Sequence, residues 1–123
     1  MFWGQDPIYV ELIEHQPNDR SLITFKITTN GKGFASNVWF AGVKIQELDN
    51  FIVNAKQGNR VFVNSSEQPA KVGKSQLTFD TYPNTRIYIG AGELSFTLLE
   101  GNTVRLLLDK LTKMLNDIKP KAY

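Results

Sequence analysis

The chain contains no cysteine and only one histidine, His15. The missing thiols exclude disulfide bonds, cysteine-ligated zinc, iron–sulfur clusters and thiol catalysis. A single imidazole leaves a Ser-His-Asp triad one candidate base, and it rules out a metal site with several histidine ligands. His15 follows Glu14 in a turn-forming segment, a setting more typical of a surface histidine than of a catalytic one. We therefore expect no metal and no cofactor.

Long hydrophobic runs are also missing. The densest apolar stretch, residues 94–118, is interrupted by Glu100, Arg105, Asp109, Lys110 and Lys113, so no membrane-spanning segment is expected. The first residues, Met-Phe-Trp-Gly-Gln-Asp, lack the basic group with which a secretion signal begins. These features predict a cytoplasmic location, although a chain without cysteine also suits export by another route.

The composition is that of an ordinary globular domain, with 41% hydrophobic and 21% charged residues. A chain of 123 residues buries roughly two-thirds of its extended surface. That is enough for one core and too little for two ordinary domains, so residues 1–123 are expected to form a single domain. The net charge of +2 is weak evidence for a polyanionic partner. Residues 1–19 nevertheless carry only acidic charges, namely Asp6, Glu11, Glu14 and Asp19.

Alternation of apolar and polar residues predicts strands. The clearest is residues 21–29, where Ile23, Phe25 and Ile27 share one face and Lys26 lies on the other. Turn chemistry at 15–20 predicts a hairpin with the preceding strand, and Asn30-Gly31 predicts the next turn. The expected strands are residues 8–14, 21–29, 34–41, 60–64, 76–82, 86–90 and 93–99.

Two segments have helical periodicity. In residues 44–56 the apolar side chains recur at helical spacing, and Gly58 is placed to end that helix. A second helix is expected to begin at Asn102 or Thr103 and to stop at Pro120. Its apolar stripe consists of Val104, Leu107, Leu108, Leu111, Met114, Leu115 and Ile118. We interpret this stripe as core rather than as a partner-binding surface.

The element order is therefore β-β-β-α-β-β-β-β-α. Strands joined by short turns predict one antiparallel sheet, with the two helices on one side of it and the C-terminal amphipathic helix packed on the sheet. The expected fold class is α+β.

Sequence motifs for chemistry are absent or incomplete. Gly73-Lys74-Ser75 resembles the end of a phosphate-binding loop, but position 68 is glutamine where the motif needs glycine, and a strand follows instead of a helix. Gly31-Lys32-Gly33 fails as a dinucleotide fingerprint because the third glycine is replaced by Ser36. Nothing in the sequence argues for an enzyme.

Aromatic residues expected on the outside of the sheet favour binding instead. If Val38 and Phe40 face the core, Trp39 faces away from it, and the same orientation is open to Tyr82 and Tyr88 on other strands, with Arg86 beside them. Trp, Tyr and Arg are the residues enriched at interface hot spots. Lys71 and Lys74, in the polar loop 65–74, would lie at the rim. The alternative is that a helix or the N-terminal segment covers this face, which would make the aromatics core.

The order of elements suggests a comparison with a known family. A strand meander, the helix Ile45-Gln46-Glu47-Leu48-Asp49-Asn50-Phe51, further strands, and Leu94-Ser95-Phe96 before a leucine-rich terminal helix resemble the WapI-like bacterial immunity proteins. The likeness covers roughly residues 20–118 and rests on element order and apolar pattern. It implies a small cytosolic bacterial protein that binds and neutralises a toxin encoded beside it.

The leading hypothesis from sequence is thus a non-enzymatic protein-binding domain, an immunity-like inhibitor of a partner toxin. Its interface would comprise Trp39, Tyr82, Arg86 and Tyr88, with Lys71 and Lys74 nearby. Single-stranded nucleic-acid binding by the same aromatics and lysines is the alternative. A small enzyme or ligand carrier is a third, which requires a closed pocket with convergent polar groups. The oligomeric state is left open, since helix or strand-edge pairing would each make a dimer.

Overall fold

The computed structural model describes residues 8–16, 19–29, 37–65, 75–91 and 95–122. The elements follow the expected order, and the α+β class is confirmed. They are β1 (Ile8–Gln16), β2 (Asp19–Thr29), β3 (Asn37–Lys44), α1 (Ile45–Lys56), β4 (Val61–Asn64), β5 (Ser75–Asp80), β6 (Arg86–Ala91), β7 (Ser95–Glu100) and α2 (Asn102–Ala122). Neither helix in these ranges is both long enough and apolar enough to cross a membrane.

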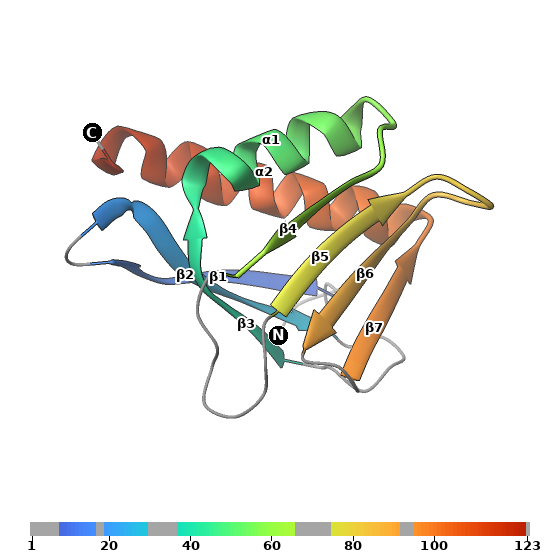
Figure 1. Cartoon of the computed structure of the whole chain (residues 1–123), viewed down its shortest axis with the longest axis horizontal. Helices are drawn as coiled ribbons and strands as arrows, with labels where there is room; N and C mark the ends of the chain where they lie inside the picture. Colours follow the sequence, from blue (N-terminus) through green and yellow to red (C-terminus); the bar gives the residue numbers. More distant parts are fainter. Residues whose placement is uncertain (1–7, 17–18, 30–36, 66–74, 92–94, 123) are drawn as a thin grey trace, which may run out of the picture.

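The strands form two antiparallel sheets, one of order β1-β2-β3 and one of order β4-β5-β6-β7 (Figure 1). The expectation of one continuous sheet is wrong, because α1 follows β3 directly and β4 pairs only with β5. The sheets meet where β3 approaches β5. There the Ser75 hydroxyl donates a hydrogen bond of 2.6 Å to the main-chain oxygen of Trp39.

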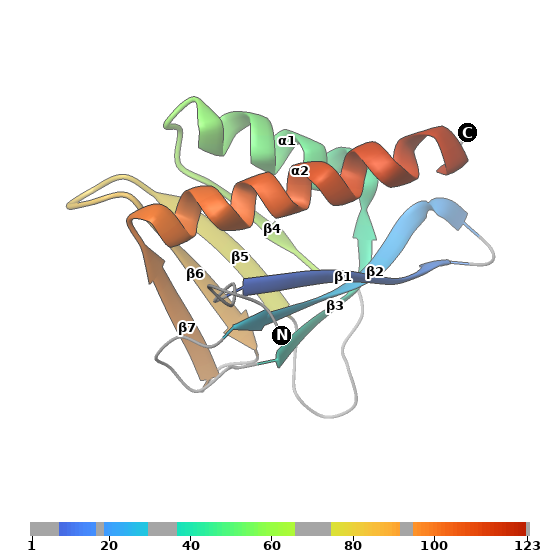
Figure 2. The same cartoon turned by 180° about the vertical axis from the view of Figure 1, so that it is seen from behind.

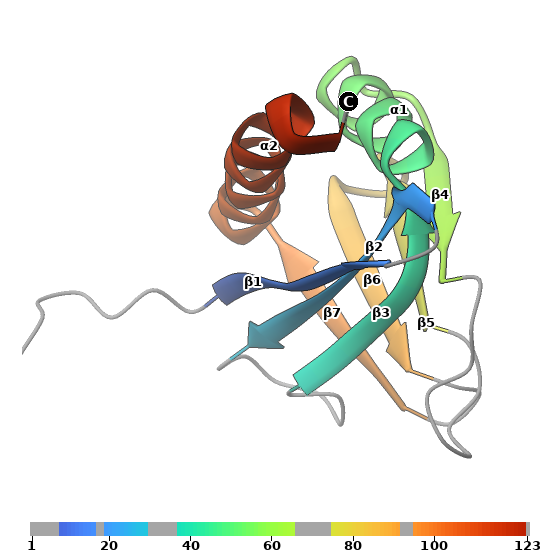
Figure 3. The same cartoon turned by 90° about the vertical axis from the view of Figure 1, so that its left-hand side faces the viewer.

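Both helices lie on the same side of the molecule (Figure 2). Seen from the end, α1 and α2 lie next to each other above the two sheets (Figure 3). The long helix α2 contacts β1 of one sheet and β7 of the other, while α1 contacts β4 and α2. The predicted packing of the C-terminal helix on a sheet is therefore confirmed, with the difference that α2 spans two sheets.

The helix α1 forms where the spacing predicts it. Its apolar residues Ile45, Leu48, Phe51, Ile52 and Ala55 are all buried. Gly58 has a φ of +83°, and its N–H donates to Ala55 while the N–H of Asn59 donates to Asn54. This pair of main-chain hydrogen bonds is a Schellman motif, which satisfies the last carbonyls of the helix. The role predicted for Gly58 is confirmed.

The whole apolar stripe of α2 is buried, as predicted. The predicted stop at Pro120 is wrong, because the helix continues to Ala122. Proline lacks only its own N–H, so in the last turn it removes a single main-chain hydrogen bond and the backbone can continue for two residues.

In the β1-β2-β3 sheet, the buried face of β2 is the one predicted from the alternation of apolar and polar residues. Ile23, Phe25 and Ile27 are buried, and Phe25 stacks on Phe40 of the neighbouring strand with ring centroids 4.9 Å apart. The third strand begins at Asn37, so the first residues of the predicted range 34–41 lie outside the described residues.

Candidate interaction surfaces

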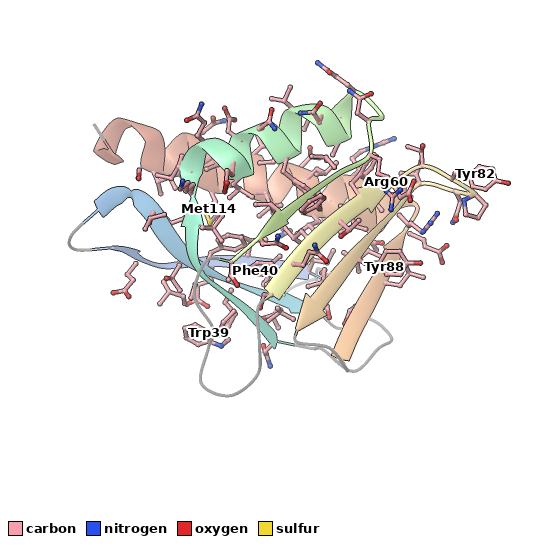
Figure 4. The ribbon with its side chains drawn as sticks, in the orientation of Figure 1. Trp39, Phe40, Arg60, Tyr82, Tyr88 and Met114 are labelled. Atoms are coloured by element: carbon pink, nitrogen blue, oxygen red, sulfur yellow. The ribbon has the colours of Figure 1, made fainter. Side chains whose placement is uncertain are left out.

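The residues predicted to form one interface belong to two different sheets. Trp39 projects from β3, whereas Tyr88 lies on β6 and Tyr82 in the β5–β6 turn, well separated from it (Figure 4). Arg86 contacts both tyrosines. Lys71 and Lys74 lie outside the described residues. The structure therefore defines two candidate surfaces.

The first surface, the Trp39 face, is the outer side of the β1-β2-β3 sheet. Trp39 is 44% exposed. Tyr9 and Ile13 of β1 are exposed apolar side chains of the same sheet, with Tyr9 at its border with α2 and Ile13 where the β1–β2 register shifts. Glu11, Lys26 and Trp39 are register partners across the three strands. The Lys26 ammonium lies 3.5 Å from the Glu11 carboxylate and 5.6 Å from the centroid of the Trp39 ring. These contacts hold the side chain of Lys26 beside the indole.

The β1 edge of the Trp39 face is acidic. Glu11 and Glu14 of β1 are both exposed, and Lys26 is the cation that pairs with Glu11. Among the side chains that the structure describes in this sheet, Lys44 is a second cation, and it is the last residue of β3, where α1 begins. The side chain of Arg20 in β2 is not described. Three of the four N-terminal acidic residues noted in the sequence thus belong to the sheet that carries Trp39, because Asp19 is the first residue of β2. Asp6 lies outside the described residues, and the side chain of Asp19 is not described.

The second surface, the Tyr88 face, is the outer side of the β4-β5-β6-β7 sheet. Phe62, Thr78, Tyr88 and Leu98 are register partners in one row across all four strands. Phe62 is 61% exposed, and it was not among the residues predicted to lie at an interface. The signal is present in the alternation Val61-Phe62-Val63, because the burial of Val63 turns Phe62 outward.

A second row of the Tyr88 face consists of charged residues that alternate in sign. Asp80 pairs in register with Arg86, and Arg86 pairs with Glu100. Arg60 precedes β4 and extends the row, because its Nε lies 3.6 Å from the Asp80 carboxylate. The order from β4 to β7 is therefore Arg60, Asp80, Arg86, Glu100.

Arg86 has a structural role in addition to its predicted place at an interface. Its side chain is only 15% exposed and lies 3.5 Å from the Asp80 carboxylate. The guanidinium donates to the main-chain oxygens of Tyr82 and Asn84 and lies 5.5 Å from the Tyr88 ring centroid. Arg86 thus holds the β5–β6 turn, which presents Tyr82 with 81% of its surface exposed.

Asp80 fixes the same turn from the other side. Its Oδ1 accepts hydrogen bonds from the main-chain N–H groups of Thr81, at 2.8 Å, and Tyr82, at 3.2 Å. The bond from Tyr82 is the main reason that the pKa of the Asp80 carboxyl lies below its ordinary value, and the Thr81 N–H, Arg86 and Arg60 act in the same direction. Partial desolvation opposes them.

The grooves on the surface are open. One of about 530 Å³ lies between β1 and α2 and is lined by Val10, Leu12 and Met114, among others. At its edge the Lys110 ammonium lies 5.8 Å from the centroid of the Tyr9 ring. Another groove of about 510 Å³ lies between the end of α1 and the start of α2. Neither is the enclosed pocket with convergent polar groups that a small-molecule site requires.

Within the described ranges, acidic and histidine side chains form no group of three that could hold a metal ion.

In comparisons with known proteins, no family model, no curated protein and no solved structure matches the chain. The function is therefore argued from the two faces and from their chemistry.

Proposed function

We propose that this chain is a non-enzymatic protein-binding domain that captures a partner protein with its Trp39 face. The observation that supports the proposal best is the exposure of Trp39 on a sheet, with Tyr9 and Ile13 also exposed on the edge strand β1 of that sheet. Tryptophan and tyrosine supply large, rigid contact areas and are enriched at interface hot spots. A globular domain gains no stability from exposing them, so their exposure favours a role in recognition.

The charges of the face indicate the kind of partner. Glu11 and Glu14 line its β1 edge, so a basic protein surface is the complement there. Opposite charge accelerates association and suppresses wrong partners. Combined with the resemblance noted in the sequence, this favours an immunity-like inhibitor that occludes the toxic domain of a basic toxin in a bacterial cytoplasm.

The same charges disfavour single-stranded nucleic acid as the partner. On the described part of the Trp39 face, Lys26 beside the indole is already paired with Glu11, and the acidic β1 edge repels phosphates. On the Tyr88 face, the described cations Arg60 and Arg86 alternate with Asp80 and Glu100, so this row carries no net positive charge to attract phosphates.

The experiment is affinity capture from the native host with the wild-type chain and with Trp39→Ala as bait, followed by calorimetry with the captured protein. We expect one partner to be retained by the wild type and bound at least about tenfold more weakly by the variant. The melting temperature should be nearly unchanged because the indole is half exposed. Val53→Ala, which truncates an exposed apolar side chain on α1, is the matched control and should bind like the wild type.

Two outcomes would contradict the proposal. One is a partner that binds Trp39→Ala as tightly as the wild type. The other is tight binding of a single-stranded oligonucleotide that is lost in Trp39→Ala and falls steeply with salt, which would identify a nucleic-acid-binding face instead.

A further inference from the structure

We propose that the Tyr88 face binds a second copy of this chain, giving a two-fold symmetric dimer in which the two four-stranded sheets pack face to face. The inference is independent of the proposed function, because the Trp39 face belongs to the other sheet. It rests on the order of side chains across the sheet, which is complementary to itself.

The charged row carries the argument. In the proposed dimer the two-fold axis lies between the two packed sheets, is parallel to the strands and passes over the space between β5 and β6. Rotation about this axis reverses the order of the strands, so β4 of one copy faces β7 of the other and β5 faces β6. Arg60 then lies opposite Glu100 of the other copy, and Asp80 lies opposite Arg86. A row that reads plus, minus, plus, minus from β4 to β7 thus meets its own complement at every position.

Arg60 and Glu100, at the two ends of this row, are the residues that such pairing would stabilise most. The Arg60 side chain is 78% exposed, and the interaction described for it uses only its Nε. Glu100 is also exposed, and one of its oxygens accepts a hydrogen bond of 2.5 Å from the Asn84 amide. A guanidinium and a carboxylate at these positions can form a bidentate pair across the interface.

The apolar row is compatible with the same symmetry. Reversal places Phe62 opposite Leu98 of the other copy and Thr78 opposite Tyr88, so the exposed phenyl ring meets an aliphatic side chain. In the next row Gly90 pairs with Gln76 in register, and in the dimer each Gly90 lies opposite the exposed Gln76 of the other copy. Gly90 has no side chain of its own at the position opposite that glutamine.

The size of the face predicts a weak dimer. Four strands of about six residues cover roughly 20 Å by 20 Å. Covering this area on both copies buries about 800 Å² in total, less than the roughly 1,000 Å² of a stable specific interface, so the dimer should be weak and exchange with the monomer. We expect a dissociation constant in the range of about 1 μM to 1 mM.

The experiment is sedimentation equilibrium on the wild type and on two charge reversals, Arg60→Glu and Glu100→Arg. Each variant alone places like charges opposite each other, so its dimer should be at least about tenfold weaker than that of the wild type. In an equal mixture the two variants can form a heterodimer. One of its two outer pairs then has the charges exchanged between the copies, and the other is the native Arg60–Glu100 pair, so a dimer should form again. Arg105→Glu, the same charge change on the exposed side of α2, is the control and should dimerise normally.

A third variant tests the contact between Gly90 of one copy and Gln76 of the other. Among the described side chains and main-chain atoms, a Cβ at Gly90 would meet only the Gln76 main-chain oxygen, at 3.8 Å, so Gly90→Val should fold as well as the wild type but weaken the dimer. Trp39→Ala should leave it unchanged. The proposal is overturned if the wild type stays monomeric up to about 1 mM. It is equally overturned by a dimer that the charge reversals do not weaken, or by a mixture that gains nothing over the single variants.

Discussion

At the residue scale, Asp80 links the β5–β6 turn to the charged row of the Tyr88 face. Its carboxylate accepts two main-chain N–H groups and lies within 3.6 Å of nitrogens of Arg60 and Arg86. All of these groups favour the ionised form. The sequence shows an aspartate at the end of a strand, but not this convergence, which depends on the register of three strands.

The lowered pKa of Asp80 has a consequence for stability. A carboxyl whose pKa is lower in the folded than in the unfolded chain stabilises the fold above the unfolded value, and this contribution is lost as the pH falls through the folded value. Asp80→Asn should therefore lower the melting temperature at pH 7, and the difference from the wild type should shrink as the pH falls below the ordinary value of 3.8. Thermal melts from neutral to acid pH measure this.

The matched control is Asp109→Asn, which neutralises an exposed carboxylate on α2. It should leave the melting temperature at pH 7 close to that of the wild type. A pH-independent difference between the wild type and Asp80→Asn would show that the aspartate acts only through geometry.

At the scale of elements, both helices and most strand faces could be predicted from the sequence. The spacing of Leu48, Phe51 and Ile52 in α1 is a local pattern, and it determines the buried side whatever the helix packs against. The end of α2 could not be placed from Pro120, because a proline in a last turn removes only one hydrogen bond. The exposure of Phe62 could be predicted only from the alternation Val61-Phe62-Val63, a short signal because β4 has four residues.

The Schellman motif at the end of α1 provides a test at this scale. Gly58 has a φ of +83°, a conformation that costs an L-residue about 1–2 kcal/mol. Gly58→Ala should lower the free energy of unfolding by about that amount, as measured by urea denaturation. No atom of the described residues lies within 4 Å of the added Cβ, so the loss would come from the backbone alone.

Gly90→Ala serves as the comparison for that variant. Gly90 lies in a strand without a positive φ, so alanine there should be neutral or slightly stabilising. Equal losses in the two variants would contradict the assignment of the Gly58 effect to the left-handed conformation.

At the scale of the whole molecule, the division into two sheets could not be predicted. Alternation identifies which side of a strand is buried, but it does not say which strands pair across an intervening helix. The same limit applies to the candidate surfaces. Local pattern places both Trp39 and Tyr88 on outer faces, and only the tertiary arrangement separates them onto β3 and β6.

The link between the sheets can be tested directly. Ser75 is buried, and its hydroxyl donates to the Trp39 main-chain oxygen at 2.6 Å. Ser75→Ala would leave this acceptor without its donor in a region of low water access, so the free energy of unfolding should fall by about 1–3 kcal/mol. Gln76→Ala, one residue further along β5 and exposed, should cost much less. Equal losses would argue that the hydrogen bond contributes little.

The separation of Trp39 and Tyr88 onto different sheets also affects how this protein can change over time. Substitutions at distant sites without shared neighbours usually have additive effects. Outward-pointing residues of β1-β2-β3 can therefore be substituted, by evolution or in a library, with little effect on binding by the outward-pointing residues of β4-β5-β6-β7. The same fold can in this way acquire a new binding specificity on one sheet while the other sheet keeps its binding specificity.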